Sequence, residues 1–308
     1  MKLLNFFFSW FDNRIKEREY QRKKINAQDI DWLRVIPYIG LHIAVISLFF
    51  VGYSHTALIV FIILYALRMF AITGFYHRYF SHKSFRTSRP MQFIFAVLGA
   101  SAVQRGPLWW AAHHRKHHVH SDTEHDHHSP MTKSFFWSHT GWFLTKENFL
   151  TEIRWVKELA RFPELKLIDR FDLIVPIIFC VGLFILGELL GNFYPELATS
   201  GWQLVSWGFV LSTVILYHST FLINSASHLW GKRRYKTKDG SKNNFILALL
   251  TFGEGWHNNH HHYPGSARQG FYWWEIDITY YILKLMSYIG LIWDLRTVSP
   301  TVRESNKA

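Results

Sequence analysis

Four long apolar segments constrain this chain more than any other feature. They are residues 35–53, 57–76, 171–190 and 202–222. A helix of about 20 residues spans roughly 30 Å, which is the thickness of the hydrocarbon core of a bilayer. The chain is also 49% hydrophobic and 18% aromatic, which is unusual for a soluble globular protein. We therefore predict an all-α integral membrane protein with four transmembrane helices.

The short connections 54–56 and 191–201 turn these helices into two hairpins, each returning to the side that it left. The long segments 1–34, 77–170 and 223–308 then share one compartment. Every Lys and Arg except Arg68 lies in these long segments, and neither short connection carries one. Because positive charge is retained on the cytosolic side, both termini and any site built from the long segments are predicted to be cytosolic, at the inner membrane if the chain is bacterial.

We expect one membrane domain over residues 1–308. An N-terminal interfacial or cytosolic segment, 1–34, opens with an aromatic-rich amphipathic anchor. The hairpins 35–76 and 171–222 are capped by a cytosolic helical domain built from 77–170 and 223–308. The apolar stretches 91–104 and 276–295 are shorter or interrupted by charge, so we expect interfacial or bundle-packed helices there.

Histidine is the second strong feature, with 19 residues in the chain. Four groups fall on the predicted cytosolic face: His77 and His82 in HRYFSH, His114, His117 and His118 in HRKHH, His228 in NSASH, and His257, His260 and His261 in HNNHH. Side chains at positions i, i+3 and i+4 share one side of a helix. Side chains five residues apart, such as His77 and His82, point about 140° away from each other and could reach around a metal ion. Nine such ligands are too many for one ion and suit a dimetal site.

The chemistry of the ligands narrows the kind of site. Neutral imidazole binds iron, zinc, copper or nickel, so ligand type alone leaves the metal open. The single cysteine, Cys180, lies in the third apolar segment, which excludes a disulfide, a CxxC site and an iron–sulfur cluster. Asp122, Glu124, Asp126 and Glu254 lie near the motifs, and we expect them to accept the far ring N–H of the ligand histidines.

Together, HRYFSH, HRKHH and HNNHH resemble the three histidine boxes of the membrane fatty-acid desaturases. NSASHLWG and FFWSHTGW are similar to the acyl-CoA delta-9 (stearoyl-CoA type) branch, in a bacterial-like form without a fused cytochrome b5. The resemblance implies two iron ions held by the nine histidines, with Asn224 holding a metal-bound water. It implies O2-dependent desaturation of a saturated acyl chain to a cis double bond, at the delta-9 position. How the ligands divide between the irons stays open.

The same resemblance implies a bent substrate tunnel, because Gln104, Trp110 and Thr220 stand at the offsets of the residues that line the bend. It implies acyl-CoA as the substrate. Two departures leave an acyl-lipid or carrier-protein substrate open: Ala112 and His113 replace an Arg-Asp pair, and Thr132 and Lys133 replace a basic pair.

No HPGG haem-binding stretch is present, so the electrons are expected from a separate cytochrome b5- or ferredoxin-type protein. The basic cytosolic surface suits an acidic donor.

Two other functions place different demands on the sequence. A membrane hydroxylase of alkanes or acyl chains would use similar boxes, but NSASH and the bend-lining residues favour desaturation. A histidine-rich metal transporter would need polar ligands near mid-span. The net charge of +12 is explained by the positively charged cytosolic segments of a membrane protein. No nucleic-acid recognition motif accompanies this charge, so we do not expect a nucleic-acid partner.

The remaining histidines and charges have expected roles outside the site. We expect packing or hydrogen bonding for His42, His55 and His218. His113 and His262 flank the HxxHH motifs but lie off the helix side that the ligand histidines share, so we do not expect them to bind metal. We expect a solvated or second-layer loop for His120, His125, His127 and His128, and a solvated loop for the basic run 232–244. Arg68 is expected to face the bundle or to line the substrate path.

Overall fold

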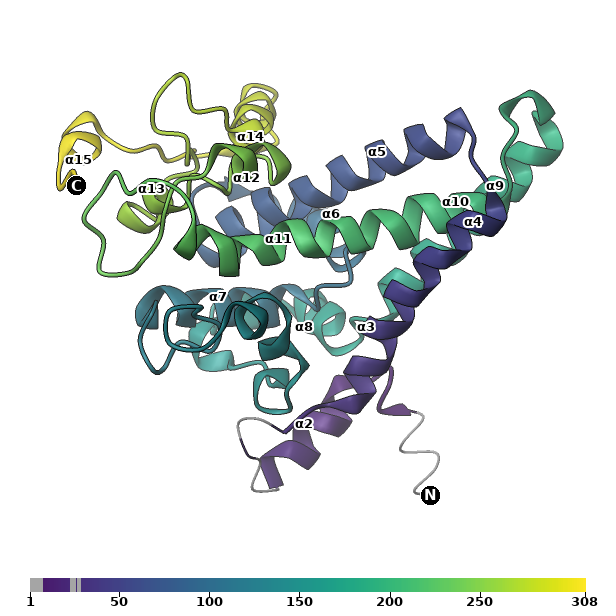
Figure 1. Cartoon of the computed structure of the whole chain (residues 1–308), viewed down its shortest axis with the longest axis horizontal. Helices are drawn as coiled ribbons and strands as arrows, with labels where there is room; N and C mark the ends of the chain where they lie inside the picture. The colour runs from purple at the N-terminus through teal and green to yellow at the C-terminus, as the bar shows by residue number, and fades with distance from the viewer. Residues whose placement is uncertain (1–7, 23–25, 27–28) are drawn as a thin grey trace.

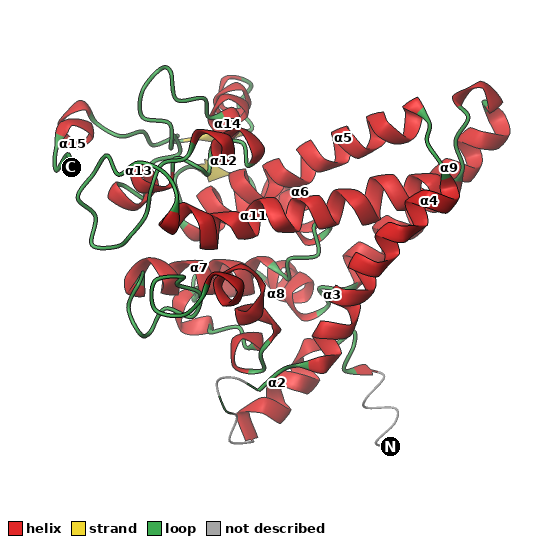
Figure 2. Cartoon of the chain, in the orientation of Figure 1, coloured by secondary structure: helices red, strands yellow, loops and turns green. Residues whose placement is uncertain are grey.

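The computed structural model describes residues 8–22, 26 and 29–308. Within these residues the regular structure is almost entirely helical (Figure 2). The only strands of the described chain are β1 (Arg86–Thr87) and β2 (Ile292–Trp293), which pair antiparallel. The prediction of a mostly helical chain is therefore confirmed.

Among the described residues, four continuous helices are long and apolar enough to cross a membrane, and they overlap the four predicted segments. Their bounds are Trp32–Val51, His55–Ser81, Ile174–Phe193 and Gly201–Leu229. The first consists of α3 (Trp32–Ala44), a 3-10 turn and α4 (Leu48–Val51), and the second of α5 (His55–Phe70) and a π-helical stretch (Ala71–Ser81). The third is α9 (Ile174–Phe193), and the fourth runs from α10 (Gly201–Leu204) through a π-helical stretch (Val205–Leu211) into α11 (Ser212–Leu229). Helices α5 and α11 lie side by side (Figure 1).

The turn between α4 and α5 is bonded to the start of the fourth helix. Ser54 Oγ donates to Gln203 Oε1 at 2.6 Å, and Gln203 Nε2 donates to the Val51 carbonyl at 3.1 Å. Trp207 Nε1 donates to the Gly52 carbonyl at 2.9 Å. Backbone groups of the turn thus find partners within the protein, as a chain in a low-dielectric medium requires.

The other helices gather around the C-terminal end of α11, and we call them together the cap. They are α6 (Arg89–Ala100), α7 (Pro107–His120), α8 (Pro163–Arg170), α12 (Phe245–Leu250), α13 (His257–His262), α14 (Ile278–Tyr288) and α15 (Pro300–Glu304). In Figure 1, α12 to α15 lie above the end of α11, whereas α7 and α8 lie below it. Helices α6 and α14 have 12 and 11 residues, too few to cross a bilayer, as expected for 91–104 and 276–295.

The N-terminal helix α2 (Asn13–Arg22) packs on the cap. Asn13 Nδ2 donates to the Asp169 carbonyl at 2.8 Å, and Lys16 Nζ pairs with Asp31 at 2.5 Å. The expected amphipathic anchor at the start of the chain falls largely on residues 1–7, which lie outside the described residues.

The main hydrophobic core surrounds the π-helical stretch that follows α5. Phe75 stacks on Phe95 of α6, with ring centroids 3.8 Å apart. A Cβ at Gly99 would meet the Tyr76 ring at 2.2 Å, so glycine is required for α6 to approach so closely. The close packing fixes the position of the stretch, which carries His77.

Arg68 is fully buried among the long helices. Its guanidinium donates to Thr213 Oγ1 at 2.7 Å, to the Ser101 carbonyl at 3.2 Å and to the Gly208 carbonyl at 3.3 Å, and it also contacts Ser212. It therefore faces the bundle, which was one of its two expected positions.

Replacing Arg68 by leucine should destabilise the protein without changing where a substrate reacts. The substitution leaves buried acceptors without donors, at a cost of roughly 1–3 kcal/mol. Thermal unfolding in detergent should show a midpoint lower by several degrees. The control is Arg86→Leu, because Arg86 is 73% exposed and its ion pair with Asp294 contributes little. Equal midpoints for the two variants would contradict a structural role for Arg68.

Candidate metal centre

Two groups of imidazoles lie together where the cap meets the ends of the second and fourth long helices. The first cluster consists of His77, His82, His114, His118 and His260, and the second of His117, His228, His257 and His261. In each cluster the ring nitrogens lie within 4.8 Å of one another. The structure thus brings together all nine histidines selected from the sequence, and none of them is left outside.

Each HxxHH motif supplies both clusters. On α7, His114 and His118 face the first cluster, whereas His117 faces the second. On α13, His260 faces the first cluster, whereas His257 and His261 face the second. In each motif the histidines at i and i+4 therefore belong to one cluster, and the histidine at i+3 belongs to the other. Each helix thus lies between the two clusters.

His77 and His82 are brought to one side by the π-helical stretch. The His82 N–H bonds to the His77 carbonyl at 3.2 Å, an i to i+5 bond, and the two ring centroids are 4.9 Å apart. The expected splay of about 140° assumed an α-helix and is wrong here. A π-helical turn is wider, so residues five apart lie above one another, and such turns are frequent at functional sites.

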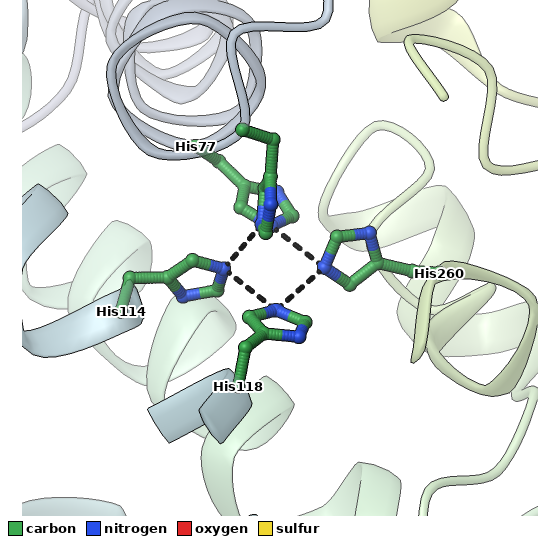
Figure 3. Close-up of side chains that lie close together, drawn as sticks. His77, His114, His118 and His260 are labelled. Atoms are coloured by element: carbon green, nitrogen blue, oxygen red, sulfur yellow. Dashed lines mark hydrogen bonds between the residues drawn. The ribbon is translucent and has the colours of Figure 1, made fainter. Parts of the chain in front are cut away.

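The ring nitrogens of the first cluster converge on one point. Figure 3 shows the rings of His114, His118 and His260 turned toward one another beneath His77. The Nε2 atom of His118 lies 3.0 Å from Nε2 of His114 and 2.9 Å from Nε2 of His260. The Nε2 atom of His260 lies 3.1 Å from that of His77. His82 Nε2 completes the group at 2.8 Å from His114 Nε2.

Carboxylates fix the orientation of the rings in the second cluster. His117 Nδ1 donates to Asp126 at 3.0 Å, and His228 Nδ1 donates to Asp122 at 2.9 Å. His261 Nδ1 donates to Asp239 at 2.8 Å. In the first cluster, His77 Nδ1 pairs with Glu254 in the same way. A neutral ring that donates its Nδ1–H to a carboxylate presents the lone pair of its Nε2 to the cluster.

Converging lone pairs are the donor set of a metal ion. Two lone pairs cannot form a hydrogen bond, and His261 Nε2 is buried without any hydrogen-bond partner. A cation at each centre would satisfy these nitrogens. The all-imidazole set, with no thiolate, fits a transition-metal ion such as iron, zinc or copper. The residues present therefore fit a pair of metal ions.

A cavity of about 440 Å³ adjoins the first cluster at His114. The three predicted tunnel residues, Gln104, Trp110 and Thr220, all line it, and so does Asn224. Gln104 Nε2 donates to Thr220 Oγ1 at 2.9 Å, and Trp110 Nε1 donates to Gln104 Oε1 at 3.3 Å. These bonds hold the three side chains as one unit. Arg68 is not among the lining residues, so it does not line this cavity.

The sequence profile of the family described as fatty acid desaturase matches residues 54–289, which contain every histidine of both clusters. The chain belongs to the fatty acid desaturase family.

Three relatives of known activity illustrate the similarity. The desaturase is 38% identical over 272 residues to the sn-2 palmitoyl-lipid 9-desaturase of Nostoc sp. (strain 36), covering 86% of this chain and 90% of that protein. It is 37% identical over 265 residues to the sn-1 stearoyl-lipid 9-desaturase of Anabaena variabilis, and the match covers 85% of this chain and 92% of that protein. It is 32% identical over 303 residues to the icosanoyl-CoA 5-desaturase of Limnanthes douglasii, covering 95% and 79%.

Burial keeps most imidazoles of the desaturase in the neutral, metal-binding form. It lowers the pKa of five of them well below the usual histidine value: His82, His114, His118, His257 and His260. Burial also lowers the pKa of His261, to about 4. Burial acts in the same direction on His117, but the Asp126 carboxylate outweighs it and raises the pKa of that ring. Metal binding should therefore displace a proton from His117.

The carboxylates beside the second cluster are ionised. Burial alone would raise the pKa of Asp122, but the hydrogen bond from His228 lowers it to about 2. Asp122 is held in place by Ser129 Oγ at 2.5 Å and the Gly240 N–H at 2.6 Å. Its negative charge compensates part of the charge that metal ions would bring into the cap.

The loop after α7 is only partly solvated. His127 and His128 are buried and pack with Trp142, which agrees with the second-layer alternative for these two residues. The His128 ring lies 4.3 Å from that of His117 and forms a third possible metal-binding group with His117 and Asp126. Glu124 is exposed, so it does not support a ligand histidine. A sequence alone cannot distinguish which part of a polar loop folds back into the protein.

Asp239 is a supporting residue that the sequence did not reveal. It lies in the basic run 232–244, which we expected to be a solvated loop, yet it accepts the bond from His261. Asp239 also accepts from the Ser241 N–H at 3.0 Å. The only sequence signal is the Asp-Gly pair, which is typical of a turn and carries no information on its partner.

The other histidines form hydrogen bonds away from the clusters. His42 Nε2 lies 3.1 Å from His218 Nε2, and His218 Nδ1 lies 3.0 Å from His139 Nε2. His113 is buried with its Nε2 3.3 Å from the Leu150 carbonyl, and His262 Nε2 donates to the Val302 carbonyl at 2.9 Å. These positions agree with packing and bonding roles.

Replacing Asp239 by asparagine should weaken metal binding. The amide can still accept the bond from His261 but lacks the charge that increases ligand basicity, so affinity should fall about tenfold. Metal retained after dialysis against a chelator, measured by mass spectrometry, tests this. Asp294→Asn is the control, because Asp294 is 60% exposed and pairs with Arg86 rather than with a histidine. Equal amounts of retained metal in both variants would show that Asp239 does not support metal binding.

Proposed function

We propose that this desaturase uses O2 to introduce a cis double bond at the delta-9 position of a saturated acyl chain carried by a membrane lipid. The observation that carries the proposal is the apolar cavity that ends beside the paired imidazole clusters. The whole chain acts as one membrane domain in this proposal.

The two clusters suit two iron ions, one held by five imidazoles and the other by four. When bound, the iron pair supplies the reduction of O2 and the oxidising power that removes two hydrogens from the chain. Asn224 lies on α11 one turn before His228 and lines the cavity. We assign it the role of holding a water ligand.

The residues of the chain position the substrate. Gln104, Trp110 and Thr220 line the cavity near the first cluster and are bonded to one another. We assign them to the bend of the acyl chain, because a fixed bend selects which carbons face the clusters and favours a cis product. The apolar lining excludes water from the reacting part of the chain.

An acyl-lipid is a better substrate assignment than acyl-CoA. Two of the relatives are named for palmitoyl-lipid and stearoyl-lipid substrates. Ala112 and the buried His113 stand where the acyl-CoA enzymes that the sequence resembles have an Arg-Asp pair. Acyl-CoA stays the second candidate, supported by the icosanoyl-CoA relative.

The orientation in the membrane and the electron supply follow from charge. The distribution of Lys and Arg supports a multi-pass protein with both termini and the clusters on the cytosolic side. A separate cytochrome b5- or ferredoxin-type protein would supply the electrons. Exposed Lys232, Lys236 and Lys238 offer positive charge in the loop that carries Asp239.

A hydroxylase is the closest alternative function, since it would use the same oxidant and differ only in the fate of the substrate radical. A metal transporter is disfavoured because the clusters lie in the cap, at the ends of the long helices. Product analysis separates these possibilities.

Replacing His118 by alanine should abolish product formation. We would express the wild-type chain and the variant in one host and analyse the lipids by gas chromatography with double-bond location. The wild type should yield a cis-monounsaturated acid. His120→Ala is the control on the same helix, because His120 belongs to neither cluster. Normal product with His118→Ala would refute the site, and hydroxylated acids would identify a hydroxylase.

A further inference from the structure

The cavity beside the clusters is walled by two of the long apolar helices. Tyr38 and Leu41 of α3 line it on one side, and Ile177, Cys180 and Val181 of α9 line it on the other. Both helices are long and apolar enough to cross a membrane. The cavity therefore extends from the cap into the level where these helices would meet lipid.

Two cavity-lining residues of α9 are also exposed. Ile177 and Val181 line the cavity, yet they are 46% and 52% exposed. A side chain that borders both a cavity and the exterior marks an opening. The neighbouring residues Ile36 and Ile39 of α3 are also exposed and apolar. The opening thus has a hydrocarbon-like rim, which suits lipid tails better than water.

Charged groups lie where the two helices begin. Arg34, Arg105 and Asp172 line the same cavity. Arg105 Nε lies 2.8 Å from Asp172, and Arg34 Nη1 lies 3.6 Å from it. The arginine side chains are only 13% and 14% exposed. Arg34 also donates to Asn13, and Arg105 Nη2 donates to the Phe149 carbonyl at 3.2 Å. A guanidinium has five N–H donors, so these contacts and the shared carboxylate still leave donors for oxygen atoms of a ligand.

We propose that a membrane glycerolipid enters sideways, through the gap between α3 and α9. Its acyl chain lies along the cavity toward Trp110 and His114, and its ester oxygens accept hydrogen bonds from Arg34 and Arg105. Ester oxygens are common to all glycerolipids, so this recognition needs no particular head group. The inference rests on the proposed function and adds the route of the substrate and the part of the lipid that is bound.

Two neighbouring positions on α9 provide the test. Ile177 lines the cavity, whereas the adjacent Ile178 is 66% exposed and does not line it. Each is replaced by cysteine in a Cys180→Ala background, because Cys180 is the only native cysteine. The iron-loaded variants are reconstituted in dipalmitoyl phosphatidylglycerol vesicles with reduced ferredoxin and labelled with pyrene maleimide. Mass spectrometry establishes complete labelling, and each variant is compared with its own unlabelled sample.

The label at Ile177→Cys should reduce formation of the monounsaturated lipid at least tenfold, because it fills the opening. The label at Ile178→Cys should change it less than twofold. Equal turnover before and after labelling at Ile177→Cys would overturn the inference and indicate entry from the cytosolic side, as a soluble acyl-CoA would enter. Equal loss at both positions would also overturn it. If the unlabelled variants and the wild type desaturate no lipid, the proposed function itself fails.

Discussion

The convergence of nine imidazoles inside a buried cap is the constraint on which the rest of the structure depends. Neutral histidines with facing lone pairs repel one another and make poor hydrogen bonds, so the arrangement is costly without cations. Carboxylates offset part of this cost by fixing the tautomers, as Asp122, Asp126 and Asp239 do for the second cluster. Hydrogen bonds within the protein therefore hold these histidine rings in the orientation that metal binding requires.

The first cluster depends on a different set of contacts, centred on the π-helical stretch. Glu254 pairs with both His77 and Arg78, and Arg78 also pairs with Asp277 at 2.9 Å. Gln269 Nε2 donates to Glu254 at 2.9 Å and ties the loop after α13 to the same network. A buried guanidinium with two carboxylates is stable only when all partners are present. The network thus makes the position of His77 dependent on three distant segments of the chain.

Much of this architecture could be predicted from the sequence. Apolar runs of about 20 residues and the absence of Lys and Arg from two short loops are sufficient to predict four long helices. The spacing of HRKHH and HNNHH is sufficient to select ligand-type histidines. The division into five and four could not be predicted, because it depends on where α7 and α13 lie relative to one another. Nor could the π-helical turn between His77 and His82, because the sequence pattern of a π-helix resembles that of an α-helix. Asp239 was missed for a related reason, since it lies in a polar loop whose tertiary contacts leave no periodic signal. For the same reason the solvated and second-layer alternatives for His128 could not be separated.

The geometry of the site links substrate position to the metal centre through α7. Trp110 lies one turn before His114 on this helix, so the residue that contacts the bend of the cavity and a ligand of the first cluster share one rigid element. The Trp110 and His114 rings stack with centroids 5.0 Å apart. Any shift of α7 would move Trp110 and His114 together, so in the proposed function the cavity wall and the cluster would keep their relative position. On α11, Thr220 likewise lines the cavity and lies about two turns before His228 of the second cluster. In the proposed function, the position of the double bond would therefore depend on helix geometry, whereas chain length and head group would be set by the far end of the cavity.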